Sequence, residues 1–167
     1  MEQRVKAIKT VYADHLFRSR LEARWAVYFD ALGIKWEYES EGYAVNGSAY
    51  LPDFYFPELD FYGEIKPADF GDSDLAKWTA FAEAIRKPLV IFEGLPHAKD
   101  CRAFYYDGLV FTDYQRVIPF AHLTREKYGM FWHCGNPENW SAYQPYRAAI
   151  SKAKQRQFEF TNSNTPF

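Results

Sequence analysis

The sequence predicts an α/β fold in which a mixed central sheet is flanked by helices. Two segments with the periodicity of amphipathic helices are separated by segments in which apolar and polar residues alternate. A short, wholly apolar segment, Leu89–Phe92, follows the second helical segment and is typical of a buried central strand. A helix that leads into a buried strand suits a crossover onto a sheet, which gives the order helix, three strands, helix, strand.

Helix-end signals place the first helix at about Ser19 to Leu32. Ser19 and Glu22 have the spacing of a capping box, and Gly33 stands where a glycine commonly ends a helix. Two further helices are expected at about Ser73–Arg86 and Ser141–Gln157.

Strands are expected in the segments with alternating apolar residues. The first three are placed at about Ile34–Glu41, Ala49–Phe56 and Phe61–Lys66. The loop between the second and third, Pro57–Asp60, is short enough for a hairpin. Further strands are expected at about Arg102–Tyr106 and Leu109–Phe111, around the turn signal Asp107-Gly108, and at about Gly129–Cys134.

Composition favours one folded domain. The chain has 167 residues, of which 48% are hydrophobic and 20% aromatic. We expect a single domain over residues 1–160 and a polar tail at 161–167. No apolar run is long enough to cross a membrane, and two cysteines far apart favour an intracellular, cytoplasmic protein without disulfides. The net charge of −2 argues against a protein that coats nucleic acid by bulk charge.

The hairpin geometry brings three charged residues together. With a four-residue loop, Phe56 pairs with Phe61, and counting outward places Asp53 opposite Glu64. Side chains alternate between faces along a strand, so Lys66 projects on the same face as the two acids. A bulge in either strand would instead move Asp53 to the other face.

Two facing carboxylates repel each other, and a divalent cation between them would remove that cost. Mg²⁺ prefers oxygen and is commonly held by one or two carboxylates together with water and substrate phosphates. Lys66 would then assist an attacking water or offset charge on phosphorus. The pattern therefore favours a metal-dependent reaction at a phosphate group.

These residues resemble the signature of the PD-(D/E)XK nuclease superfamily. The motif consists of Pro52-Asp53 followed by Glu64-Ile65-Lys66 on two adjacent predicted strands, after a helix that carries Glu22. The resemblance covers about residues 17–92, a little under half of the chain, and extends to small nucleases encoded by phages and prophages. It implies a restriction-endonuclease-like core (αβββαβ), with residues 93–160 as a C-terminal elaboration.

The resemblance also implies a site and an activity. Asp53, Glu64 and Glu22 would bind Mg²⁺ or Mn²⁺, the Ile65 carbonyl would be a further ligand, and Lys66 would be the catalytic lysine. The implied reaction is phosphodiester hydrolysis in DNA by a metal-activated water. Many nucleases of this type dimerise, so a homodimer is compatible with the resemblance.

Several residues have a simpler interpretation. Glu22 could only cap its helix, and Lys66 could be an exposed lysine on an edge strand. Basic residues expected on helices would either contact nucleic acid or form solvated faces; they are Lys77, Arg147, Lys152, Lys154 and Arg156. The arginines that flank Glu22 could extend a basic rim; they are Arg18, Arg20 and Arg24. The spacing of His97, Cys101, His133 and Cys134 matches no zinc motif, so packing and surface roles are expected for them.

The leading hypothesis is therefore a small Mg²⁺-dependent DNA endonuclease. One alternative is a non-enzymatic binding module on the same scaffold. Another keeps the chemistry but acts on RNA or branched DNA.

Overall fold

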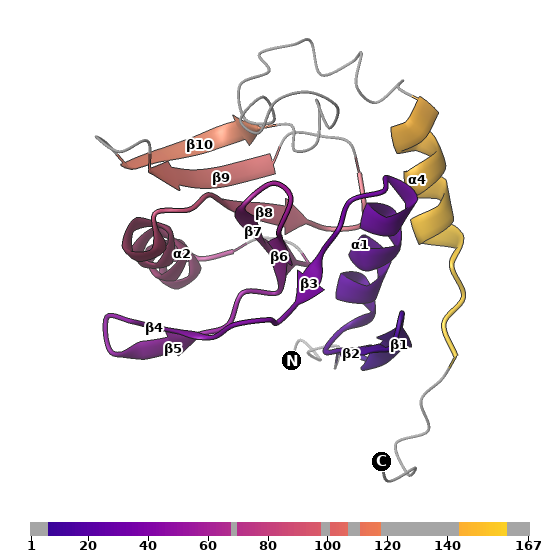
Figure 1. Ribbon diagram of the computed structural model, residues 1–167, viewed down its shortest axis with the longest axis horizontal. Helices are drawn as coiled ribbons and strands as arrows, with labels where there is room; N and C mark the ends of the chain where they lie inside the picture. The colour runs from indigo at the N-terminus through magenta and orange to yellow at the C-terminus, as the bar shows by residue number, and fades with distance from the viewer. Residues whose placement is uncertain (1–6, 68–69, 98–100, 107–110, 118–143, 160–167) are drawn as a thin grey trace, which may run out of the picture.

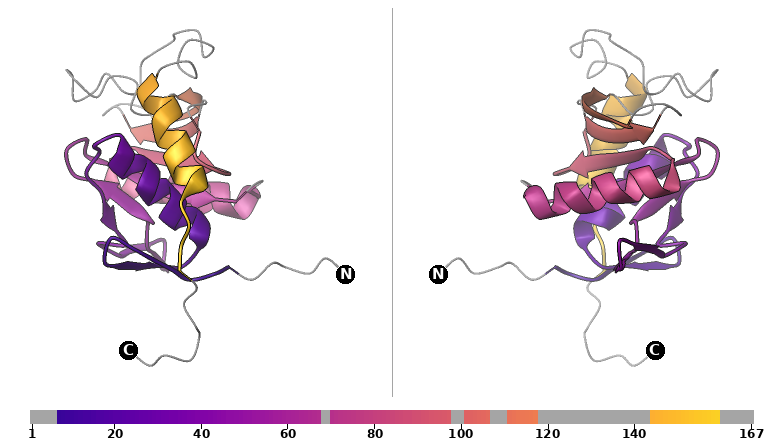
Figure 2. Two further views of the ribbon diagram at one scale, coloured as in Figure 1. Left: turned by 90° about the vertical axis from the view of Figure 1, so that its right-hand side faces the viewer. Right: turned by 90° about the vertical axis from the view of Figure 1, so that its left-hand side faces the viewer.

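The computed structural model describes residues 7–67, 70–97, 101–106, 111–117 and 144–159, which form three layers (Figure 1). A mixed sheet is the middle layer; helices α1 and α4 cover one of its faces and α2 covers the other (Figure 2). The strands are β1 (Thr10–Tyr12), β2 (His15–Phe17), β3 (Glu37–Tyr38), β4 (Tyr43–Val45), β5 (Ser48–Tyr50), β6 (Phe54–Phe56), β7 (Phe61–Lys66), β8 (Leu89–Glu93), β9 (Cys101–Tyr106) and β10 (Phe111–Val117). The helices are α1 (Arg20–Ala31), α2 (Asp72–Ile85) and α4 (Gln144–Gln155).

The central sheet has six strands in the order β10-β9-β8-β7-β6-β3. Strands β7 and β8 run parallel and are joined through α2, while the other neighbours are antiparallel. The prediction of an α/β fold with a mixed sheet and a crossover helix is therefore confirmed. The segment Leu89–Phe92 is indeed a buried strand inside this sheet.

Helix α1 begins and ends where the sequence signals place it. The Ser19 hydroxyl accepts a hydrogen bond from the Glu22 amide at 3.2 Å, which satisfies one of the amides at the helix start. Gly33, just beyond the helix, has a φ of 72°, a conformation that glycine adopts without strain. The inward face of α1 is aromatic, with Trp25 and Phe29 fully buried against the sheet.

Helix α4 packs along α1 through its own small apolar face, as Figure 2 shows from the side. Its buried residues, Tyr146, Ala149 and Ala153, recur at helical spacing. The predicted helix at 141–157 is therefore found at 144–155, and residues 141–143 lie outside the described part of the chain.

The predicted strand Ala49–Phe56 is wrong as a single element. It divides into β5 and β6 around Pro52, which has no N–H to donate to a sheet. β5 instead pairs with β4 in a separate hairpin, whose turn residues Asn46 and Gly47 have φ values of 49° and 78°. The predicted strand Ile34–Glu41 is likewise reduced to β3.

The second predicted hairpin is present as β9 and β10. Phe111 pairs with Tyr106, and the predicted strand start at Leu109 lies outside the described residues. The predicted strand Gly129–Cys134 and the tail 161–167 lie outside the described residues. Within the described residues, no helix is long and apolar enough to cross a membrane.

An apolar cluster lies on each face of the sheet. Under α1, the Gly63 position has room for no side chain, because an added Cβ would stand 2.9 Å from the ring carbons of both Phe56 and Phe92. The neighbouring residues Tyr62 and Glu64 point to the other face, toward α2. The strand β7 therefore carries a tightly packed face and a face with polar groups.

Candidate functional site

The candidate site lies where β6 begins and β7 ends. The predicted hairpin register is confirmed: Phe56 pairs with Phe61 and Phe54 with Gly63. The ladder ends at this last pair, so Asp53 is one position outside it. Asp53 and Glu64 are nevertheless both buried, with 4% and 7% of their surface exposed.

The Asp53 carboxylate completes the ladder with its side chain. Its Oδ2 accepts a hydrogen bond of 2.8 Å from the Ile65 amide, which has no backbone partner on that side because β6 has ended. Its Oδ1 lies 3.0 Å from Nη2 of Arg18, whose Nε pairs with Glu39. Asp53 was expected to pair directly with Glu64 across the ladder. Its carboxylate instead turns toward the end of β7 and contacts the Ile65 amide.

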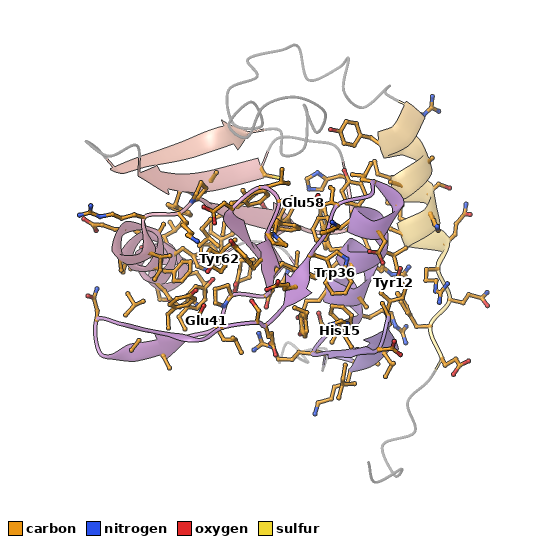
Figure 3. The ribbon with its side chains drawn as sticks, viewed as in Figure 1. Tyr12, His15, Trp36, Glu41, Glu58 and Tyr62 are labelled. Carbon is orange, nitrogen blue, oxygen red and sulfur yellow. The ribbon has the colours of Figure 1, made fainter. Side chains whose placement is uncertain are left out.

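The Glu64 carboxylate lies on the α2 side of the sheet. Its Oε2 accepts a hydrogen bond of 2.7 Å from the Tyr50 hydroxyl, which comes from the β4–β5 hairpin. Tyr62 projects from β7 on the same face and contacts Tyr43 of that hairpin, which in turn bonds Glu41 (Figure 3). The hairpin therefore covers this part of the sheet and supplies a donor to Glu64.

Lys66 is half-buried at the end of β7, beside Glu64. Its Nζ lies 4.0 Å from Glu64 Oε1, 3.4 Å from Asp74 Oδ1 and 5.4 Å from the centre of the Trp78 ring. The interpretation of Lys66 as a lysine that guards an edge strand is wrong, because β7 lies between β6 and β8. Its ammonium group is held close to the acids by α2.

Glu22 approaches the site from the first turn of α1. Its Oε1 accepts a hydrogen bond of 2.7 Å from the Ser19 hydroxyl, and its Oε2 accepts one from the Tyr38 hydroxyl. The carboxylate thus bonds the Ser19 side chain, whereas a capping box would use the Ser19 amide. Glu22 is also near enough to raise the pKa of Asp53.

Burial and mutual repulsion dominate the electrostatics of the site. Burial, the negative charge of Glu64 and that of Glu22 hold the pKa of Asp53 well above its usual value. Burial also raises the pKa of Glu64, against the Tyr50 hydrogen bond and the positive charges of Lys66 and Lys77. A cation placed among these carboxylates would favour their charged forms.

The oxygen donors fit a hard divalent cation. Of the described residues, no three His, Cys, Asp or Glu side chains converge to hold a metal ion by themselves. Mg²⁺ requires less, since one or two carboxylates with water and substrate phosphate commonly suffice. The N–H and C=O of a strand residue point to the same side, so the Ile65 carbonyl faces the side on which Asp53 lies.

The basic candidates divide between two places. Lys77 lies at the site, with its Nζ 3.7 Å from Asp74 and 5.3 Å from the centre of the Tyr50 ring. Arg147 and Lys152 are exposed on α4. Lys154 and Arg156 gather with Arg20 and Arg24 around a pocket between α1 and the end of α4. Arg18 is the member of the predicted basic rim that contacts an acid of the site.

Four residues, His97, Cys101, His133 and Cys134, were expected to pack or lie at the surface rather than bind zinc, and the two that the structure describes have packing roles. Cys101 is buried in the core, and His97 lies edge-on to Trp25 with Nε2 at 3.0 Å from the Glu93 carbonyl. His133 and Cys134 lie outside the described residues.

The sequence interpretation missed Tyr38, Tyr50 and Asp74, which contact Glu22, Glu64 and Lys66 respectively. The turn signal Asn46-Gly47 predicts a hairpin that would have placed Tyr50 on a strand, although not beside Glu64. Comparison of the chain with protein-family models, curated proteins and solved structures gave no match.

Proposed function

We propose that this protein is a Mg²⁺- or Mn²⁺-dependent endonuclease that hydrolyses phosphodiester bonds in DNA, on a restriction-endonuclease-like core of the PD-(D/E)XK type. One observation carries the proposal: two buried carboxylates, Asp53 and Glu64, lie at the end of a central strand, and the Lys66 ammonium group lies 4.0 Å from Glu64. Burying charges that repel each other costs free energy, and such groups cluster at functional sites. The resemblance of the motif adds support to this geometry.

The residues have distinct roles in the proposed reaction. Asp53, Glu64 and the Ile65 carbonyl would hold the cation, and Glu22 would add negative charge from α1. A bound Mg²⁺ supplies Lewis acidity, which lowers the pKa of water and offsets charge on phosphoryl oxygens. The ammonium group of Lys66 would stabilise charge that develops on the phosphate, because α2 fixes it beside the acids.

Contacts around the acids prepare them for this role. The Tyr50 hydroxyl orients Glu64, and the Ile65 amide orients Asp53. The guanidinium group of Arg18 offsets the charge of Asp53 in the metal-free protein. Because the Arg18 side chain is 56% exposed, a substrate phosphate could compete with Asp53 and Glu39 for its guanidinium group.

The test is metal-dependent cleavage by the purified protein. Labelled duplex, single-stranded, branched and RNA substrates are incubated with Mg²⁺, Mn²⁺ or a chelator. We expect cleavage of duplex DNA only with metal, and at least a hundredfold slower cleavage by Asp53→Asn and by Lys66→Met. Lys35→Met is the matched control, since this exposed lysine pairs with Glu58 at the surface. Full activity of both site variants would refute the proposal.

A non-enzymatic binding module is the second candidate. The observation that favours it is that each acid already has a donor from the protein: Arg18 for Asp53, Tyr50 for Glu64 and Tyr38 for Glu22. Calorimetry with Mn²⁺ separates the two candidates. Binding that Asp53→Asn removes and Lys66→Met retains supports the nuclease, whereas absence of binding at millimolar Mn²⁺ supports the module.

A further inference from the structure

Arg18 lies where the chain passes from β2 into α1, and its backbone is fixed there (Figure 1). The preceding residue, Phe17, is fully buried, and the next one, Ser19, caps α1. The Arg18 amide donates a hydrogen bond of 3.0 Å to the Tyr38 hydroxyl, which itself donates to Glu22. The Arg18 side chain therefore starts from a fixed point beside the acids of the candidate site.

The guanidinium group of Arg18 bridges two carboxylates. Its Nη2 donates a hydrogen bond of 3.0 Å to Asp53 Oδ1, and its Nε pairs with Glu39. Glu39 is held next to Asp53, because the Glu39 amide donates a hydrogen bond of 2.9 Å to the Asp53 carbonyl. One positive group thus lies between two acids that would otherwise repel each other.

This contact takes up the side of Asp53 that a metal ion would need. The other carboxylate oxygen, Oδ2, already accepts the hydrogen bond from the Ile65 amide. Only 4% of Asp53 is exposed, so few directions remain open for a further ligand of Oδ1. A metal ion bound there would stand close to the guanidinium group, and two positive charges a few ångströms apart repel each other. Arg18 and a metal ion therefore compete for the same carboxylate.

The charge of Arg18 also acts on the second acid of the site. Burial raises the pKa of Asp53 and of Glu64, and the positive charge of Arg18 opposes this rise at both carboxyl groups. A bound divalent cation would act in the same direction. Arg18 therefore does part of the work of a metal ion at these acids in the metal-free protein.

The exposure of the three side chains shows which of them can move. The Arg18 side chain is 56% exposed, whereas that of Asp53 is 5% exposed. A guanidinium group that leaves Asp53 enters water and regains its hydration, while the buried carboxylate stays in place. Glu39, with 23% of its side chain exposed, remains as a partner for Nε. Arg18 can thus release Asp53 without a change in the backbone.

We propose that Arg18 is an internal competitor of the divalent cation: its guanidinium group holds Asp53 in the metal-free protein and leaves Asp53 when the metal binds. This inference rests on the metal site of the proposed function and names a residue that regulates its occupancy. Removal of Arg18 then strengthens metal binding. A purely structural role would instead weaken metal binding or leave it unchanged.

Titration of the metal-free full chain with Mn²⁺ tests the inference, with the electron paramagnetic resonance signal of free Mn²⁺ as the readout. Arg18→Gln removes the competitor. Arg18→Lys keeps the positive charge but loses the planar fork that spans two acids. Lys77→Gln is the charge-matched control, because Lys77 acts on Glu64 through its charge. The Lys77 ammonium group lies beside Asp74 and the Tyr50 ring.

We expect Arg18→Gln to bind Mn²⁺ about tenfold more tightly than the wild type, because the metal no longer has to displace a hydrogen bond between charged groups. Lys77→Gln should change the affinity by about twofold at most, since its exposed charge is screened by water. The double variant Arg18→Gln/Asp53→Asn should lose the gain. An Arg18→Gln protein that binds Mn²⁺ no more tightly than the wild type, or whose gain survives Asp53→Asn, would overturn the inference.

Melting in chelator shows whether each variant is folded. Loss of Arg18 leaves the acids without this counter-charge, so Arg18→Gln should melt at a lower temperature than the wild type without metal and gain more from the same Mn²⁺ concentration. If Arg18→Gln does not fold, Arg18→Lys carries the test. Its affinity for Mn²⁺ should lie between those of the wild type and the expected tenfold gain, and wild-type affinity would overturn the inference.

The inference and the proposed function fail separately. Metal-dependent cleavage of DNA by the wild type, together with unchanged Mn²⁺ affinity in Arg18→Gln, would leave the nuclease standing and remove the competitor. Tighter Mn²⁺ binding by Arg18→Gln that depends on Asp53, in a protein that cuts none of the substrates, would leave the competitor standing and remove the nuclease.

Discussion

Replacement of Gly63 by alanine tests the packing that positions the candidate site. The added Cβ would stand 2.9 Å from Cε2 of Phe56 and 2.9 Å from Cε2 of Phe92, whereas ordinary contacts of this kind begin near 3.4 Å. Neither ring has open space behind it, since both are fully buried and Phe92 packs on Trp25 and Phe29. β7 must therefore move away from the aromatic layer, or the layer must move.

The expected cost follows from these contacts. Overpacking a filled core costs typically about 1–3 kcal/mol. Alanine restricts the unfolded chain more than glycine does, which returns about 0.4–1 kcal/mol. We therefore expect the free energy of unfolding of Gly63→Ala to fall by about 1–2 kcal/mol, which for a domain of this size lowers the melting temperature by about 2–8 °C.

Urea unfolding and thermal melting measure the effect, with Gly42→Ala as the control. A Cβ at Gly42 would meet its nearest neighbours only at 4.0 Å. Equal stability of the two variants would refute the proposed rigidity of the layer under β7. Because Glu64 follows Gly63 directly, Mn²⁺ binding should weaken in Gly63→Ala and remain unchanged in Gly42→Ala.

Three further changes probe the charges of the protein. The pKa of Asp53 is raised in the folded protein, so its contribution to stability is present at low pH and is lost as pH rises through that pKa. The free energy of unfolding of Asp53→Asn should therefore increase relative to that of the wild type between about pH 4 and pH 8, as measured by urea titrations. A relative decrease would contradict this. Tyr50→Phe removes a hydrogen bond to charged Glu64, so the pKa of Glu64 should rise. The acidic limb of the pH–rate profile should then move to higher pH. An unchanged limb would contradict a role of the Tyr50 hydrogen bond in setting this pKa. Arg24→Met should lower the free energy of unfolding by about 1 kcal/mol, because the part-buried carbonyl of Ala153 and the exposed carbonyls of Lys154 and Arg156 lose their donor. Arg20→Met, as the matched change, should cost less in the same melting experiment.

The local parts of the fold could be predicted from the sequence because their signals are local. The bounds of α1 follow from Ser19 and Gly33, and the register of the β6–β7 hairpin follows from the length of its loop. The break at Pro52 was readable from the missing N–H of proline, and the β4–β5 hairpin from its Asn46-Gly47 turn. The interpretation followed the alternating apolar residues instead of these two signals, because that alternation is equally typical of one continuous strand.

The candidate site could be predicted only as far as one hairpin extends. Counting along two strands brings Asp53 near Glu64 and Lys66, but no count predicts the Tyr50 hydroxyl on Glu64 or Asp74 on Lys66. Those contacts depend on how a second hairpin and a helix lie over the sheet. The basic pocket could not be predicted from local patterns at all, because its α1 and α4 residues are about 130 positions apart in the sequence.

That same distance has a consequence for the order in which the protein can form. During synthesis, α1 leaves the ribosome long before the residues of α4 that will cover it, with 129 positions between Arg24 and Ala153. Until then the surface of α1 that faces α4 remains uncovered, and the carbonyls that Arg24 will bind do not yet exist. Contacts of such long range are slow to form because a large loop must close first. We therefore expect the sheet with α1 and α2 to collapse early, and the docking of α4 to be the late step that a chaperone would protect.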